Sequence, residues 1–246
     1  TGMAVHLAGG KPVFSEILES TLCLDLEDVR RKVTSKTAGV ILVHMTGMIT
    51  PDIHEFRKFC DDNKLFLIED AAHSPGARLL GSEAGSFGHA GCFSFFPTKV
   101  ITSGEGGMLI TDNENIANKV SQLKDHGANK SDLRRHKQKG SFFLPDFKLK
   151  GFNYRMTDIQ GALGVCQMNK KDYIMNGRRK IAKKYNVSLS NLSQLIIPYV
   201  PKGYKHGYQN YTCIFTDGEN ISNLNKEQID RISTKRNVFM EKLEQM

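Results

Sequence analysis

Short apolar runs alternate with helical patterns along the first half of the chain. We predict strands at residues 13–17, 40–45, 65–68, 92–96 and 108–111, because short apolar runs bounded by polar residues or glycine are typical of buried strands. We predict helices at residues 26–33, at 115–124 and in a segment that starts at Pro51. Asp25 stands where a residue caps the first of these helices. Strands separated by helices need crossover connections, so the pattern predicts an α/β protein with a largely parallel sheet.

The second half of the chain is dominated by helical patterns. Helices are predicted at residues 154–169, 172–189 and 226–243, and a strand at 209–215. The segment 195–211 is rich in Pro, Gly and Tyr, which is typical of a boundary between structural units. We therefore expect a large domain at residues 1–190 and a smaller one at 191–246.

Composition and hydropathy exclude several classes of protein. Hydrophobic residues make up 39% and charged residues 24% of 246 residues, which is ordinary for a globular protein. The longest apolar stretch, residues 38–43, falls far short of the roughly 18 residues of a membrane span, so we expect no membrane association. No signal peptide is visible. The chain opens on Thr1 and ends within a helical pattern, so we expect a fragment that lacks both ends.

The net charge of +8, from 34 basic and 26 acidic residues, favours anionic partners. Basic residues cluster at 130–139, where a solvated loop is the favoured interpretation. The basic helix at 178–184 carries no nucleic-acid recognition motif, so no nucleic-acid partner is expected. The five cysteines are scattered, which indicates reduced thiols and a cytoplasmic location. No metal-ligand spacing occurs among cysteines and histidines, so no metal is expected.

Three residues lie at or just beyond the carboxyl ends of predicted strands, where parallel sheets bind their ligands. Asp70 follows the run at 65–68, although an acid there can also cap the following turn. Lys99 follows the run at 92–96 and precedes a glycine-rich turn, where desolvation would lower the pKa of the amine and make it nucleophilic. A surface lysine is the alternative. Ser94 could donate to a phosphate oxygen or be an ordinary strand serine.

Several ordered blocks of residues resemble those of pyridoxal-phosphate-dependent sugar aminotransferases of the DegT/StrS type. The strongest blocks lie within residues 65–107 and 151–185, and residues 1–64 match more loosely. They include Ile68-Glu-Asp-Ala-Ala-His73, Gly85-Ser-Phe-Gly88, Phe93-Ser-Phe-Phe-Pro-Thr-Lys99, Gly104-Glu-Gly-Gly107 and the segment 151–160. The resemblance implies the fold of these transferases, which is a three-layer α/β sandwich with a mostly parallel central sheet, followed by a partial, smaller C-terminal α+β domain.

The resemblance also implies roles for particular residues. Lys99 would form the Schiff base with the aldehyde of pyridoxal 5'-phosphate and move protons. Asp70 would pair with the pyridine nitrogen, and Ser94 would bind the cofactor phosphate. Asn153 would reach the cofactor phosphate of the partner subunit, which implies a homodimer with shared active sites. Arg155 would serve the substrate or pack at the interface.

The implied reaction moves an amino group, with glutamate as the expected donor, to a keto group on a nucleotide-linked sugar. Two alternatives remain, a dehydratase of the same family and a regulatory or dimerising relative without full activity. The dehydratases carry histidine in place of the lysine, so Lys99 argues against the first. His73 stands where the family commonly has Gln, near the phenolic oxygen of the cofactor, and its charge depends on pH. The family's upstream Gly-Ser/Thr turn and stacking aromatic residue are not in this chain.

Overall fold

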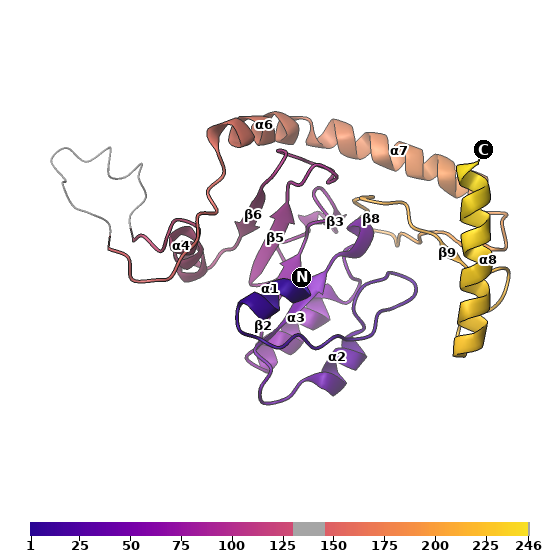
Figure 1. Ribbon diagram of the computed structural model, residues 1–246, viewed down its shortest axis with the longest axis horizontal. Coiled ribbons are helices and arrows are strands. Elements are labelled where there is room, and N and C mark those ends of the chain that lie inside the picture. Colours follow the sequence, from indigo (N-terminus) through magenta and orange to yellow (C-terminus); the bar gives the residue numbers. More distant parts are fainter. Residues whose placement is uncertain (130–145, 246) are drawn as a thin grey trace.

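The structure is a computed structural model that describes residues 1–129 and 146–245 (Figure 1). The basic cluster at 130–139 lies outside these residues. None of the helices in the described part of the chain is long and apolar enough to cross a membrane.

A four-stranded sheet forms the centre of the first half of the chain. The strand order is β1 (Gly39–Val43), β2 (Phe66–Asp70), β5 (Ala90–Ser94) and β6 (Gly107–Ile110). The first three strands run parallel, and β6 is antiparallel to β5. The sheet is therefore mixed and mostly parallel, which confirms the predicted α/β class.

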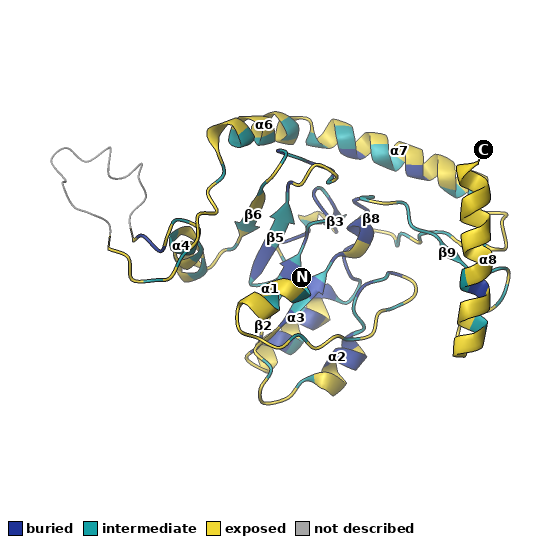
Figure 2. Cartoon of the chain, in the orientation of Figure 1, coloured by how far each residue is buried: buried dark blue, intermediate teal, exposed yellow. Residues whose placement is uncertain are grey.

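Helices α2 (Leu26–Lys32) and α3 (Ile53–Asp62) pack with β1 and β2 around the main hydrophobic core. Ile53, Phe56 and Leu67 are fully buried there. Asp25 caps α2 as predicted, because its carboxylate accepts a hydrogen bond from the backbone N–H of Glu27 at 2.9 Å. The buried residues of this core gather around the sheet in Figure 2.

A smaller antiparallel sheet joins distant parts of the chain. It has the order β4 (Ser82–Glu83), β3 (Arg78–Leu79) and β8 (Tyr204–Lys205). Residues beyond 200 therefore lie beside the first half of the chain. The remaining elements are α1 (Gly2–Leu7), a 3-10 helix (Met45–Gly47), α4 (Glu114–Leu123), α6 (Asp158–Asn169), α7 (Lys171–Leu189), α8 (Lys226–Glu244) and the paired strands β7 (Leu195–Ile196) and β9 (Ile214–Phe215).

Two of the expected elements differ from the structure at their N-terminal ends. The helix expected from 154 begins at Asp158, because Thr157 closes a capping box with Gln160. The helix expected from Pro51 begins at Ile53, with Asp52 at its N-cap.

The predicted strand at 13–17 is wrong, and the one at 209–215 is reduced to β9. The backbone N–H of Glu16 donates to the carboxylate of Asp28 at 2.8 Å, not to a neighbouring strand. Likewise, the backbone N–H of Gln209 donates to the carbonyl of Thr46 at 2.8 Å. In both segments, a backbone N–H group that a regular strand would pair with a neighbouring strand is bonded elsewhere.

Candidate active site

The candidate site lies at the carboxyl ends of β2 and β5. Asp70 is the last residue of β2 and pairs in register with Cys92 of β5, whose last residue is Ser94. Side chains alternate along a strand, so Asp70, Cys92 and Ser94 share one face of the sheet and Glu69 lies on the other. Ligands of parallel sheets bind at this end of the strands.

Two hydrogen bonds orient the carboxylate of Asp70. One oxygen, Oδ1, accepts from the backbone N–H of Ala72 at 3.2 Å, so the expected capping of the following turn is present. The other oxygen, Oδ2, accepts from the hydroxyl of Thr1 at 2.5 Å, at the N-cap of α1. The turn is thus capped by one oxygen, while the second faces the segment that carries Thr1.

Lys99 lies in a tight loop between β5 and β6. The backbone N–H of Phe95 donates to the carbonyl of Gly106 at 2.8 Å, and that of Ser103 donates to the carbonyl of Phe95 at 3.0 Å. Val100 and Ile101 are buried beside Phe95 and Met175 of α7, which anchors the loop directly after the half-buried lysine.

The glycines of this loop have a structural reason. Gly106 has a φ of +157°, and a Cβ atom there would lie 2.7 Å from the hydroxyl of Ser103. A side chain at this position would need a backbone conformation that other residues rarely adopt, and it would displace the Ser103 hydroxyl, which donates to the carbonyl of Glu105 at 2.9 Å. The turn that follows Lys99 therefore needs glycine for its shape.

His73 interacts electrostatically with both charged residues of the site, Asp70 and Lys99. Burial lowers the pKa of its imidazole, the positive charge of Lys99 lowers it further, and the negative charge of Asp70 opposes both. Its Nδ1 atom is buried and has no hydrogen-bond partner among the described residues. Asp70, His73 and Lys99, which the sequence predicts as site residues, thus share one neighbourhood. Ser94, at the end of β5, accepts a long hydrogen bond of 3.4 Å from the backbone N–H of Phe96.

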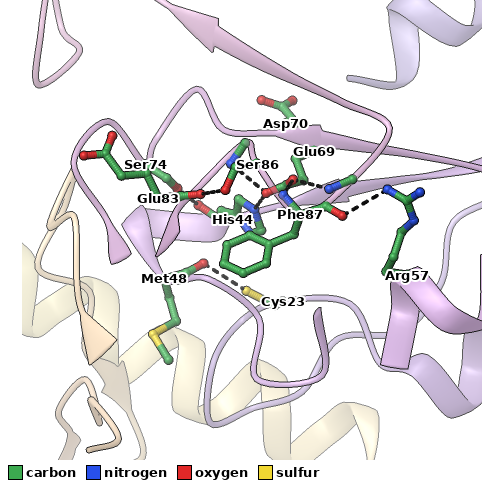
Figure 3. Close-up of polar contacts among 12 residues, drawn as sticks. Cys23, His44, Met48, Arg57, Glu69, Asp70, Ser74, Glu83, Ser86 and Phe87 are labelled. Carbon is green, nitrogen blue, oxygen red and sulfur yellow. Dashed lines mark hydrogen bonds and ion pairs between the residues drawn. The ribbon is translucent and has the colours of Figure 1, made fainter. Parts of the chain in front are cut away.

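A buried acid supports the site from the opposite face of β2 (Figure 3). Glu69 is fully buried and lies 2.7 Å from Nε2 of His44. Its carboxylate also accepts backbone N–H bonds from Gly85 at 2.7 Å, Phe87 at 2.6 Å and Gly88 at 2.5 Å. Burial raises the pKa of Glu69, but these hydrogen bonds outweigh burial and hold the pKa below its ordinary value. Sequence reasoning missed this role, although an acid within an apolar run is a signal for it.

Asn153 and Arg155 lie on a different segment, which precedes α6. Asn153 forms an isolated antiparallel bridge with Asp125, and Arg155 forms an ion pair with the same aspartate. Asn is a favoured helix N-cap residue, but Asn153 does not cap α6, because Thr157 does so. Met156 packs against the cluster that anchors the Lys99 loop, so the segment reaches the edge of the site.

The residues present fit pyridoxal phosphate. Asp70 offers a carboxylate for a ring nitrogen, Lys99 an amine for an aldehyde, and Ser94 a hydroxyl for a phosphate. The unpartnered Nδ1 atom of His73 is a buried polar group that a bound molecule could satisfy. In the part of the chain that the structure describes, no cluster of three or more His, Cys, Asp or Glu residues could hold a metal ion.

An acid and a lysine at the carboxyl ends of a mostly parallel sheet are the groups expected of an α/β protein of the aminotransferase class. Comparison with known families agrees, because the model of the DegT/DnrJ/EryC1/StrS aminotransferase family matches residues 1–243. The chain belongs to this family, whose members are in general pyridoxal-phosphate-dependent.

Individual relatives match three quarters or more of this chain. The uncharacterized protein MJ1066 of Methanocaldococcus jannaschii is 36% identical over 99% of this chain and 59% of its own length. GDP-perosamine synthase of Vibrio cholerae is 39% identical over 75% of this chain and 47% of its own length. The X-ray structure of the aminotransferase from Psychrobacter cryohalolentis has a TM-score of 0.77 and 28% identity, and covers 92% of this chain and 58% of its own. The chain thus spans about half the length of these relatives.

Proposed function

We propose that the protein carrying this chain is a pyridoxal-phosphate-dependent aminotransferase that acts on a keto group of a nucleotide-linked sugar. The observation that carries the proposal is the gathering of Asp70, His73 and Lys99 at the carboxyl ends of β2 and β5 in a member of an aminotransferase family. The name of the Vibrio cholerae relative gives a GDP-linked product, which favours a nucleotide sugar as the acceptor. Glutamate is the proposed amino donor.

Each residue has a task that follows from its chemistry. Pyridoxal phosphate, when bound, supplies an aldehyde that condenses with amines and a ring that accepts electrons. The amine of Lys99 would hold the cofactor through its aldehyde and would serve as the group that carries a proton to and from the reacting carbon. The carboxylate of Asp70 would keep the ring nitrogen protonated. The hydroxyl of Ser94 would donate to the phosphate, and His73 would donate to the phenolic oxygen.

We also propose a homodimer in which Asn153 completes the phosphate site of the partner subunit. Helix α6, which follows Asn153, has no buried residue, although it carries apolar side chains such as Ile159, 84% exposed, and Leu163, 44% exposed, which lie one turn apart on the same face. Contiguous exposed apolar surface on a soluble protein marks an interaction site. Small residues on the same helix, Gly161 and Ala162, would let a second backbone approach closely.

A cytoplasmic location is proposed on the state of the cysteines. All five are free thiols in the structure, which suits a reducing compartment.

Borohydride trapping tests the assignment of the lysine. The protein is loaded with pyridoxal phosphate, reduced with borohydride and mapped by peptide mass spectrometry, and we expect the label on Lys99. Lys99→Arg should lose the label, and Lys119→Arg, on the exposed surface of α4, should keep it. A label on another lysine of the wild-type protein would overturn the assignment. No captured cofactor at all would favour the regulatory or dimerising alternative.

Mixed dimers test the shared site. Lys99→Ala and Asn153→Asp subunits, each nearly inactive as homodimers, are combined and the heterodimer is isolated by two affinity tags. If Asn153 serves the partner, the heterodimer has one site with both lesions and one intact site, so activity returns. If Asn153 acts within its own subunit, both sites carry a lesion and the heterodimer stays inactive.

A further inference from the structure

The side-chain amide of Gln209 binds the main chain on both sides of Lys99. Its Oε1 atom accepts a hydrogen bond from the backbone N–H of Val100 at 3.1 Å. Its Nε2 atom donates to the carbonyl of Thr98 at 2.7 Å. One amide group therefore pairs with the peptide groups that flank the lysine, much as a neighbouring strand pairs with a residue.

Gln209 is itself firmly held by the segment around it. Its backbone N–H donates to the carbonyl of Thr46 at 2.8 Å. The guanidinium of Arg178, on α7, donates to the carbonyls of Tyr208 at 2.8 Å and of Gln209 at 3.3 Å. These contacts fix the backbone of Gln209, so only its side-chain rotations remain to be ordered when the amide forms hydrogen bonds.

The neighbouring residues of this segment are fixed in the same way. Arg179 donates to the carbonyl of His206 at 3.2 Å and to that of Gly76 at 2.8 Å. The backbone N–H of Gly207 donates to the carbonyl of Gly47 at 2.8 Å. Residues 206–209 thus form a rigid link between α7, the 3-10 helix and the Lys99 loop.

The Lys99 loop needs such a support on its exposed side. Residues 96–98 are exposed, whereas Val100 and Ile101 are buried in the cluster with Met175. Lys99 lies between the exposed and the buried part of the loop. Its own backbone N–H forms only a local hydrogen bond, to the carbonyl of Phe96 at 2.9 Å. Without the amide of Gln209, the N–H of Val100 would lose the partner it has in the structure.

We propose that Gln209 is a positioning residue that fixes the backbone of residues 98–100 and thereby the place of the Lys99 amine. This inference rests on the proposed function, in which Lys99 is the reactive amine. A displacement of a reacting group by about 1 Å can cost about 100-fold in rate, so a bond pair that fixes the lysine backbone has a functional consequence. Gln209 touches neither substrate nor cofactor in this proposal and acts through Lys99.

The test compares Gln209→Leu and Gln209→Asn with Asn210→Ala as the matched control. Leucine removes both hydrogen bonds, and asparagine keeps the polarity but is too short to reach both partners. Asn210 is the exposed neighbour of Gln209. For each protein, circular dichroism checks the fold, and amide hydrogen exchange is measured by mass spectrometry on the peptide that contains residues 98–100. The rate of cofactor capture on Lys99 is measured by borohydride quenching at successive times.

We expect faster hydrogen exchange at residues 98–100 and cofactor capture slowed by about tenfold or more in both Gln209 variants. Transfer should show a lower kcat with little change in the KM of the sugar nucleotide. Asn210→Ala should behave like the wild type. Wild-type exchange and capture rates in folded Gln209→Asn would overturn the inference, as would an equal slowing in Asn210→Ala. Failure of the proposed function is a separate result, because wild-type protein would then capture no cofactor on Lys99, while the exchange comparison still reports whether Gln209 holds this loop.

Discussion

Replacing Glu69 by glutamine should destabilise the protein strongly, although the two side chains have nearly the same shape. Glu69 is fully buried and its carboxylate accepts four hydrogen bonds, three from backbone N–H groups of residues 85–88 and one from His44. Glutamine keeps one oxygen and turns the other into an amide N–H2 group. If Oε1 keeps the bonds from Phe87 and Gly88, the new amide group faces the N–H of Gly85, and two donors meet.

The expected loss follows from these contacts. Hydrogen bonds to a charged acceptor stabilise a protein by about 1.5–3 kcal/mol each and neutral ones by about 0.5–1.5 kcal/mol, so neutralising the acceptor costs about 1 kcal/mol for each bond that survives. The unsatisfied N–H of Gly85 adds about 1–3 kcal/mol. The lower cost of burying a neutral group offsets part of this loss. We therefore expect a net loss of about 3 kcal/mol in the free energy of unfolding.

Urea denaturation followed by circular dichroism measures this loss, with Glu83→Gln as the control. Glu83 is half-exposed and paired with Arg78 and Lys171, so its neutralisation should cost less than about 1 kcal/mol. The pKa of Glu69 lies below its ordinary value near 4.5, so its contribution is present above that pH and is lost as the pH falls through the lowered pKa. The difference between wild type and Glu69→Gln should accordingly shrink in acid. A loss no larger than that of Glu83→Gln at neutral pH would refute the reasoning.

Three further changes have defined outcomes. Asp70→Asn should capture the cofactor on Lys99 at a near-normal rate but slow single-turnover amino transfer by about 100-fold or more, because an amide cannot hold the ring nitrogen protonated; a near-normal transfer rate would make Asp70 a structural acid. Thr157→Ala should lower the free energy of unfolding by about 1 kcal/mol, since it removes the side chain that accepts from Gln160 at 3.3 Å in the capping box of α6, and urea denaturation checks this. Gly91→Ala should lower the Tm and cost about 2 kcal/mol or more, because a Cβ atom there would lie 2.3 Å from the carbonyl oxygen of Gly85, and an unchanged Tm would contradict the close approach.

Local signals predicted those parts of the fold that local interactions determine. Helix α2 begins after Asp25 as expected, because an N-cap acts within one turn of its own helix. Strands β1 and β2 lie within two residues of the predicted runs, because continuous apolar stretches between glycine or polar residues must be buried. The expected strand at 13–17 failed because the partner of Glu16 is a side chain of α2, which no local pattern reveals.

The candidate site divides in the same way. The residue types at Asp70, Ser94 and Lys99, together with the family's motifs, predicted a site, and the structure places Asp70 and Ser94 at the ends of β2 and β5 and Lys99 in the loop after β5. Their roles toward a cofactor stay a prediction. Glu69 and Gln209 escaped notice because their roles depend on partners far away in the sequence. The amide of Gln209 reaches across 111 residues to Thr98, and a single sequence gives no indication of such a pair. The division of the chain into two domains near residue 190 stays a prediction. Residues 204–209 nevertheless contact the first part of the chain, because β8 pairs with β3 and Gln209 accepts a hydrogen bond from Val100.

The two neighbouring acids of β2 link the stability of the fold to the geometry of the site. Side chains alternate along a strand, so consecutive residues must face opposite sides of the sheet. Glu69 is held on one side by His44 and the backbone of residues 85–88 (Figure 3). Asp70 must therefore face the other side, where its charge acts on His73. A slip of β2 by one residue would turn Glu69 toward the site and Asp70 away from it, and it would cost every hydrogen bond that Glu69 makes. The buried acid therefore fixes the register of the strand that presents Asp70, even though it lies on the face of the sheet away from the site.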